Sequence, residues 1–236
     1  MNDRADPGLI QETAMLESNV VPLKERTANP GPLGLFGFGL STVLLNLHSS
    51  GFFDMNSMIL AMGLCYGGAA QVVVGIMEYK NNNTFGTTAS LSYGFFWLSF
   101  VTLDLLPRFT DSKLAPDHVA MAAYYVLWGL FTLGLFIATL RMTRALQVVF
   151  GTLALLFFLL AAGEYFELGD SFNHLTGYEG ILCGLSAFYA AIAQILNEVF
   201  EETTLPMGVV HSRRIENRRD FPGHAAQPVP PVVPRS

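Results

Sequence analysis

Four polar side chains stand inside long apolar stretches of the chain, where they could form hydrogen bonds with a passing solute. They are Thr42, Asn46, Gln71 and Asn197. An amide or hydroxyl in apolar surroundings costs free energy unless it has a hydrogen-bond partner. That partner is either a neighbouring helix or a molecule moving along a path, and the residue types fit both readings. These stretches contain no Lys or Arg, so a bare anion there would lack a counter-ion.

Two large aromatic rings lie beside very small residues. Phe38 has a glycine on each side, and Tyr93 lies between a serine and a glycine. Small neighbours let backbones approach closely, so packed helices can project such a ring into a lumen. The hydroxyl of Tyr93 can also form a hydrogen bond with a carboxyl group. We therefore consider both rings as candidates for a narrow point in a path.

Patterns that support catalysis or a resident cofactor are missing from the sequence. It has no nucleophile elbow, no zinc-protease pair of histidines and no nucleotide-binding glycine loop. Its two cysteines, Cys65 and Cys183, fall in separate apolar stretches, which indicates two core residues rather than a disulfide or metal site. We expect no enzyme activity, no cofactor and no metal.

The composition predicts an all-α membrane protein. Of the 236 residues, 51% are hydrophobic and only 14% charged, against about 25% charged in a soluble domain. Six apolar runs are each long enough to span a hydrocarbon core. We expect six transmembrane helices arranged as three hairpins, because the connections are short. The runs cover residues 33–53, 55–77, 81–103, 119–140, 145–163 and 180–197.

The placement of Lys and Arg predicts the orientation. With six spans both termini lie on one side, and all of the 13 Lys and Arg residues except Arg108 and Lys113 belong to that side. The positive-inside rule then puts both termini in the cytoplasm. We expect a disordered tail over 1–28, a transmembrane transport domain over 29–208 and a disordered tail rich in Pro and Arg over 209–236.

Two further features concern the helices themselves. The pairs Gly63 with Gly67 and Gly180 with Gly184 have the spacing that favours close helix packing. The carboxyl group of Glu179 comes just before the sixth apolar run, so we expect it at a membrane interface.

The stretch Asn29-Pro-Gly-Pro-Leu-Gly-Leu35 resembles the Asn-Pro-Ala/Val-Pro-Leu-Gly-Leu signature of the acetate uptake transporter family, which includes bacterial succinate–acetate permeases and fungal acetate transporters. The resemblance extends in order over residues 29–208, and Gly31 is the departure within the signature. It includes Glu78-Tyr-Lys, Asn83-Thr-Phe-Gly86, Ser92-Tyr-Gly and Leu196-Asn-Glu198.

The resemblance implies a homohexamer of six-helix protomers in the cell membrane, similar in fold to proton-gated urea channels. It implies a path through each protomer for acetate, and for succinate or other short carboxylates in some members, in a proton-dependent way. By position, the hydrophobic constriction of the family falls on Phe38, Tyr93 and Leu153.

Two other functions fit the sequence. One is a channel for a small neutral solute such as urea, ammonia or water. The other is a membrane signalling or scaffold protein, although the tails carry no recognisable module. Flux of acetate against urea in proteoliposomes separates the first alternative from acetate transport.

Overall fold

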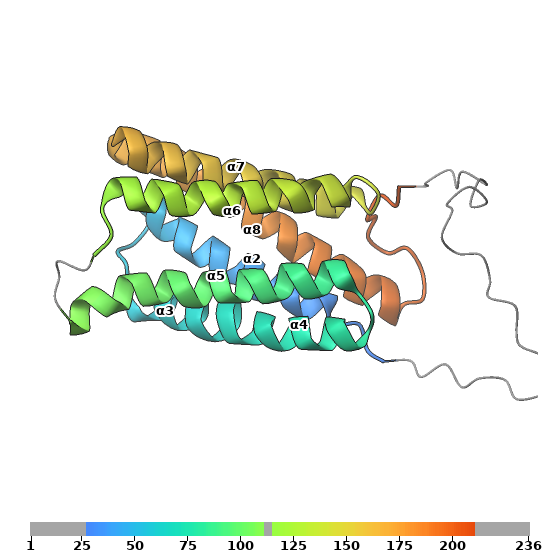
Figure 1. The fold of residues 1–236 in the computed structure, drawn as a ribbon. Coiled ribbons are helices and arrows are strands. Elements are labelled where there is room, and N and C mark those ends of the chain that lie inside the picture. The colour runs from blue at the N-terminus through green and yellow to red at the C-terminus, as the bar shows by residue number, and fades with distance from the viewer. Residues whose placement is uncertain (1–26, 111–114, 211–236) are drawn as a thin grey trace, which may run out of the picture.

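The computed structural model describes residues 27–110 and 115–210, where every element longer than a single bridge is a helix (Figure 1). The expectation of an all-α protein is therefore confirmed. The described helices are α2 (Gly31–Ser49), a continuous rod of α3 (Ser57–Met62), the π-helix η1 (Gly63–Ala70) and α4 (Gln71–Lys80), then α5 (Thr84–Phe109), α6 (His118–Thr139), α7 (Arg144–Phe166) and α8 (Gly169–Val199).

Five of these helices are long and apolar enough to cross a membrane, namely the α3–η1–α4 rod and α5 to α8. Large apolar side chains on them face outward, such as Leu127, which is 68% exposed, and Leu182, which is 58% exposed. α2 is not one of these five helices. Much of α2 is instead covered by the other helices.

The start of α2 shows why the signature stretch forms a helix end. Pro30 and Pro32 have no N–H group, and the N–H of Gly31 donates to Oδ1 of Asn29 at 3.0 Å. Few backbone donors are thus left without a partner at an end that enters apolar surroundings. The amide nitrogen of Asn29 also donates to Oε1 of Gln194, 3.1 Å away, and ties this end to α8.

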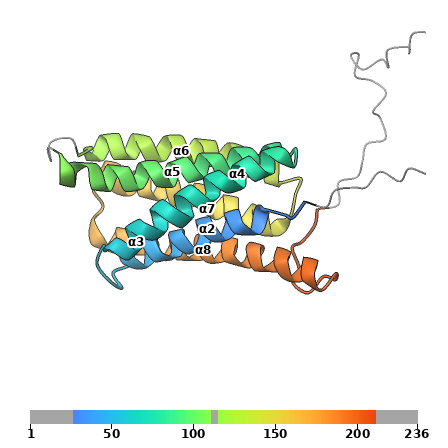
Figure 2. The same cartoon turned by 90° about the horizontal axis from the view of Figure 1, so that it is seen from below.

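α2 and α8 lie side by side and run in opposite directions (Figure 2). A Cβ atom added to Gly39 would lie 2.7 Å from the backbone oxygen of Gly184, and one added to Gly184 would lie 2.7 Å from the oxygen of Gly39. Gly180 leaves room for the side chain of Asn46 on α2. The expected packing role of the glycine pairs is confirmed here, and Gly63 and Gly67 likewise pack against the ring of Trp97.

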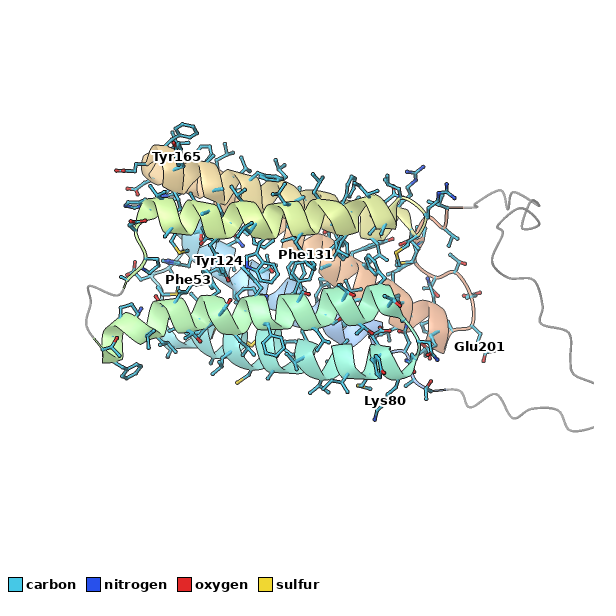
Figure 3. The ribbon with its side chains drawn as sticks, in the orientation of Figure 1. Phe53, Lys80, Tyr124, Phe131, Tyr165 and Glu201 are labelled. Atoms are coloured by element: carbon cyan, nitrogen blue, oxygen red, sulfur yellow. The ribbon has the colours of Figure 1, made fainter. Side chains whose placement is uncertain are left out.

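The pairing of helices differs from three simple hairpins. α6 packs along α7, the α4 end of the rod packs along α5, and α2 has its most extensive contact with α8 rather than with the rod that follows it. The backbones of α5 and α6, by contrast, scarcely approach each other in the described residues. Aromatic side chains fill this seam, and Tyr124 and Phe131 point from α6 into it (Figure 3).

α8 begins earlier than the sixth apolar run. It starts at Gly169, so Glu179 lies inside the helix and not at its end. Both carboxyl oxygens of Glu179 are buried and have no hydrogen-bond partner within residues 27–110 and 115–210. The helix thus extends beyond the sixth apolar run at its N-terminal end, and the interfacial position of Glu179 stays a prediction.

Both ends of the described chain lie at one end of the bundle, together with Lys80 and Glu201, while Tyr165 lies at the other end (Figures 1 and 3). After α8, residues 205–210 return to the α6–α7 connection. There the N–H groups of Arg144 and Ala145 donate to the oxygens of Gly208 and Met207. The expected tails over 1–28 and 209–236 lie almost wholly outside the described residues.

Candidate functional site

Two cavities, each of about 170 Å³, lie one after the other inside the bundle. Both are walled mainly by α2, α5 and α7, the first, third and fifth helical rods of the described chain. We name them after one polar residue in each. The Gln71 cavity opens toward the end that holds residue 29, and the Asn46 cavity lies on the side of the α2–α3 connection.

Phe38 and Leu153 line both cavities and are the two residues that the linings share. Phe38 is 6% exposed and Leu153 is 3% exposed. The ring of Tyr93 lines the Gln71 cavity, with its centroid 6.0 Å from that of Phe38. The structure thus brings together the three residues that the resemblance placed at a constriction, at the wall between two cavities.

Tyr93 is held by more than packing. Its hydroxyl donates a hydrogen bond to Oγ1 of Thr132 on α6, at 3.0 Å, and that hydroxyl in turn donates to the backbone oxygen of Trp128 at 2.7 Å. A carbonyl oxygen only accepts, so the proton of Thr132 goes to Trp128 and the proton of Tyr93 goes to Thr132. The remaining lone pairs of the Tyr93 oxygen can only accept.

The Asn46 cavity has a polar edge on α2. The hydroxyl of Thr42 donates to the backbone oxygen of Phe38, and the side-chain amide nitrogen of Asn46 donates to the backbone oxygen of Thr42, each at 2.8 Å. Both bonds stay within α2, and within residues 27–110 and 115–210 neither side chain forms a hydrogen bond to another helix. The oxygen of the Asn46 amide is left as an acceptor beside the cavity.

Gln71 combines the two roles that the sequence left open. Its amide nitrogen donates to the backbone oxygen of Gly34 at 3.2 Å, which joins α4 to α2. It also lines the Gln71 cavity, and its amide oxygen is buried without a hydrogen-bond partner in the described part of the chain. A buried acceptor without a partner costs free energy. A hydrogen-bond donor that enters the cavity would remove this cost.

Asn197 has a different setting. It lies outside the linings of both cavities, and its amide bonds both to the N–H and to the backbone oxygen of Leu205, at 2.9 and 2.8 Å. The side chain therefore fastens the segment after α8 to the end of that helix. The contacts give it a role in local structure, and it also lines a third pocket together with Asn29 at this end of the bundle. Its place in a path stays a prediction.

A polar group at the open end of the Gln71 cavity was not foreseen. The carboxyl group of Glu78, 5% exposed, accepts a hydrogen bond from the amide of Asn83 at 2.7 Å, and Asn29 with Gln194 lines the same end. Each of these residues was visible in the sequence as a polar group at the end of an apolar run. Their convergence depends on the α2–α8 and α4–α5 contacts.

The sequence of the chain was compared with protein families and with known proteins. The model of the GPR1/FUN34/yaaH family matches residues 13–209. The succinate-acetate/proton symporter SatP of Escherichia coli strain K12 is 48% identical over 188 residues, which are 79% of this chain and 98% of SatP. Acetate permease A of Emericella nidulans is 35% identical over 184 residues, 71% of this chain and 61% of the permease.

The fold was compared with solved structures. The structure of the bacterial acetate channel SatP matches with a TM-score of 0.74 and 49% sequence identity, and the match covers 78% of this chain and all of that one. Sequence and fold agree, and the family match includes all the helices described above. The chain belongs to the GPR1/FUN34/yaaH family of membrane transport proteins.

Proposed function

We propose that this protein carries acetate across the cell membrane in a proton-linked way, through the two cavities of each protomer. The observation that supports this most directly is the meeting of the two cavities at Phe38 and Leu153, with the ring of Tyr93 beside them. An apolar constriction of this kind resists the passage of water and ions by dewetting. The relatives named for acetate transport support the same substrate.

The polarity of the path favours acetic acid over the acetate anion at the constriction. Neither cavity is lined by a Lys or Arg in the described residues, whereas the Gln71 cavity is lined by the carboxyl group of Glu78. An anion would therefore lose its hydration without gaining a cation. The free lone pairs of the Tyr93 oxygen act in the same direction, because an ionised carboxylate has no proton to donate.

The wider architecture of the proposal has three parts. The protomer has six transmembrane passes, with α2 as the one that is covered by the others. Both termini are cytoplasmic, which agrees with the position of the described chain ends, residues 27 and 210, at the same end of the bundle as Lys80. Protomers assemble as a homohexamer, which would cover part of the outward apolar surface. Succinate is a second permeant that the relatives suggest.

Uptake of labelled acetate into proteoliposomes at external pH 5 to 8 tests the function. Acetic acid titrates near pH 4–5, like a side-chain carboxyl, so each unit of lower pH gives about ten times more acid at constant total acetate. We expect the initial rate to rise as the external pH falls, above the passive rate of protein-free liposomes. A protein-dependent rate that stays flat from pH 8 to pH 5 would contradict passage as the acid.

A channel for a small neutral solute is the second candidate, because an apolar constriction without charge also admits neutral molecules. Flux of urea through the same proteoliposomes decides between them. Acetate uptake with no protein-dependent urea flux supports the first function. Urea flux without acetate uptake would replace it by the second.

A further inference from the structure

Thr132 is the residue from which the further inference starts. It is fully buried on α6, and it is absent from the linings of both cavities in the described structure. A permeating molecule therefore does not touch it. Its hydroxyl nevertheless accepts the hydrogen bond of Tyr93, whose ring stands beside Phe38 at the wall between the cavities.

The hydrogen bond from Tyr93 to Thr132 crosses the seam between α5 and α6. The backbones of the two helices scarcely approach each other, so side chains alone hold them together. Hydrogen bonds cross the described seam at two levels: Tyr93 to Thr132, and Ser99 to Tyr124 at 2.7 Å. Aromatic contacts add to these bonds, such as those of Tyr93 with Trp128 and Phe131; Figure 3 shows Phe131 pointing from α6 into the seam.

Three hydrogen-bonding groups in series give the Tyr93 side chain one preferred position. The backbone oxygen of Trp128 takes the proton of Thr132, and Thr132 can then only accept from Tyr93. If the ring turned away from α6, the buried hydroxyl of Tyr93 would lose its partner, which is unfavourable in apolar surroundings. The bond to Thr132 thus opposes rotation of the ring out of its place beside Phe38.

We propose that Thr132 is a positioning residue for selectivity: it holds the Tyr93 ring at the constriction and so sets the size limit of a path that it does not line. The inference rests on the proposed function, since it concerns the constriction of the acetate path. It adds a residue on α6, a helix that contributes only Tyr125 to the cavity linings of the described structure.

The test compares Thr132→Val with Thr132→Ser in reconstituted, folded protein. Valine has nearly the shape of threonine but cannot accept the bond, whereas serine keeps the hydroxyl. We expect the ratio of succinate to acetate uptake to rise about three- to tenfold in Thr132→Val, the equilibrium effect of losing one hydrogen bond. The ratio of Thr132→Ser should equal that of the unchanged protein.

Ser99→Ala is the matched control for a general loosening of the seam. It removes the hydrogen bond at the other level, while Tyr124 keeps a contact with the backbone oxygen of Phe96 at 3.4 Å. We expect its uptake ratio to stay unchanged. A rise in Ser99→Ala equal to that in Thr132→Val would assign the effect to the seam and overturn the positioning role.

The double variant Tyr93→Phe with Thr132→Val supplies a second measurement. Phenylalanine has no hydroxyl that needs a partner, so the ring should keep its packed position and the ratio should return to that of Tyr93→Phe alone. An unchanged ratio in folded Thr132→Val that still takes up acetate would overturn the inference and leave the proposed function standing. If the protein without substitutions shows no protein-dependent acetate uptake, the proposed function itself is refuted.

Discussion

At the scale of single residues, Phe38 and Leu153 should decide which acids pass. Phe38 and Leu153 form the wall that separates the two cavities, so truncation to Ala opens a wider gap between the cavities. We therefore predict that Phe38→Ala and Leu153→Ala raise succinate uptake relative to acetate uptake. Labelled uptake of both acids in reconstituted variants measures the ratio. The truncation itself costs about 2–5 kcal/mol of stability, so only monodisperse protein is compared.

Leu156→Ala is the control for this truncation. Leu156 is buried on α7, 4% exposed, and lines the Asn46 cavity but not the Gln71 cavity in the described structure. Its loss should cost similar stability and leave the uptake ratio unchanged. Equal ratios in Leu156→Ala, Phe38→Ala and Leu153→Ala would remove the constriction from the latter two residues.

The two deep amides should separate into different phenotypes. Asn46→Leu is expected to raise the apparent KM for acetate and keep the folded yield, since the bond that it loses lies within α2. Gln71→Leu should raise KM and also lower the yield, because it removes a bond between helices worth on the order of 1 kcal/mol. Uptake kinetics give KM, and gel filtration gives the monodisperse fraction.

Asn197→Leu serves as the reference for these variants, because Asn197 fastens Leu205 and lies outside the linings of both cavities in the described structure. Its KM for acetate should be normal, whatever happens to the segment after α8. A raised KM in Asn197→Leu would extend the path to the pocket that Asn197 shares with Asn29. A normal KM in both Asn46→Leu and Gln71→Leu would contradict the proposed lining of the path.

At the scale of helices, close contact between α2 and α8 is the feature that the fold depends on most. A methyl group at position 184 would lie 2.7 Å from the backbone oxygen of Gly39, which cannot move aside as a side chain can. We predict that Gly184→Ala destabilises the protein by about 1–3 kcal/mol or more, measured as a lower melting temperature in detergent.

Gly134→Ala is the matched control on α6. A Cβ at this position would meet no described atom within 4 Å. Alanine favours a helix over glycine by about 1 kcal/mol in water-exposed positions, so the melting temperature should stay the same or rise. A melting temperature of Gly184→Ala equal to that of Gly134→Ala would show that α2 and α8 do not need their close approach.

At the scale of the whole molecule, the orientation in the membrane can be tested by labelling single cysteines. In a background of Cys65→Ser and Cys183→Ser, we compare Asp54→Cys in the α2–α3 connection with Lys80→Cys at the end of α4. An impermeant maleimide added to intact cells should label Asp54→Cys and not Lys80→Cys. The reverse pattern would place both termini outside.

The labelling rests on the unequal distribution of positive charge. Lys80, Arg141 and Arg144 lie in short connections, where the positive-inside rule is most effective. Both described ends of the chain lie at the end of the bundle that carries Lys80 (Figures 1 and 3). Labelling of both positions in lysed cells confirms that each introduced cysteine is accessible.

The sequence by itself determined the class of fold and most of the helices. Uncharged runs of spanning length leave the backbone no other way to satisfy its hydrogen bonds in lipid than a helix, so the helices follow from composition alone. The family followed from the signature that begins at Asn29, in which proline and asparagine remove or satisfy the backbone donors of a helix end. Phe38 and Tyr93 were candidates because of their small neighbours in the sequence, whereas Leu153 and the joint constriction came from that resemblance.

Only the tertiary structure decided which helices lie together and which polar groups meet. The order of the apolar runs does not predict that α2 packs on α8. That contact depends on the backbones of Gly39 and Gly184, two glycines that are distant in sequence. The bond from Tyr93 to Thr132 and the convergence of Asn29, Glu78 and Gln194 likewise need helices from different parts of the chain. Local pattern sets the conformation of each segment, whereas contacts between distant segments depend on the shapes that fit when all helices pack at once.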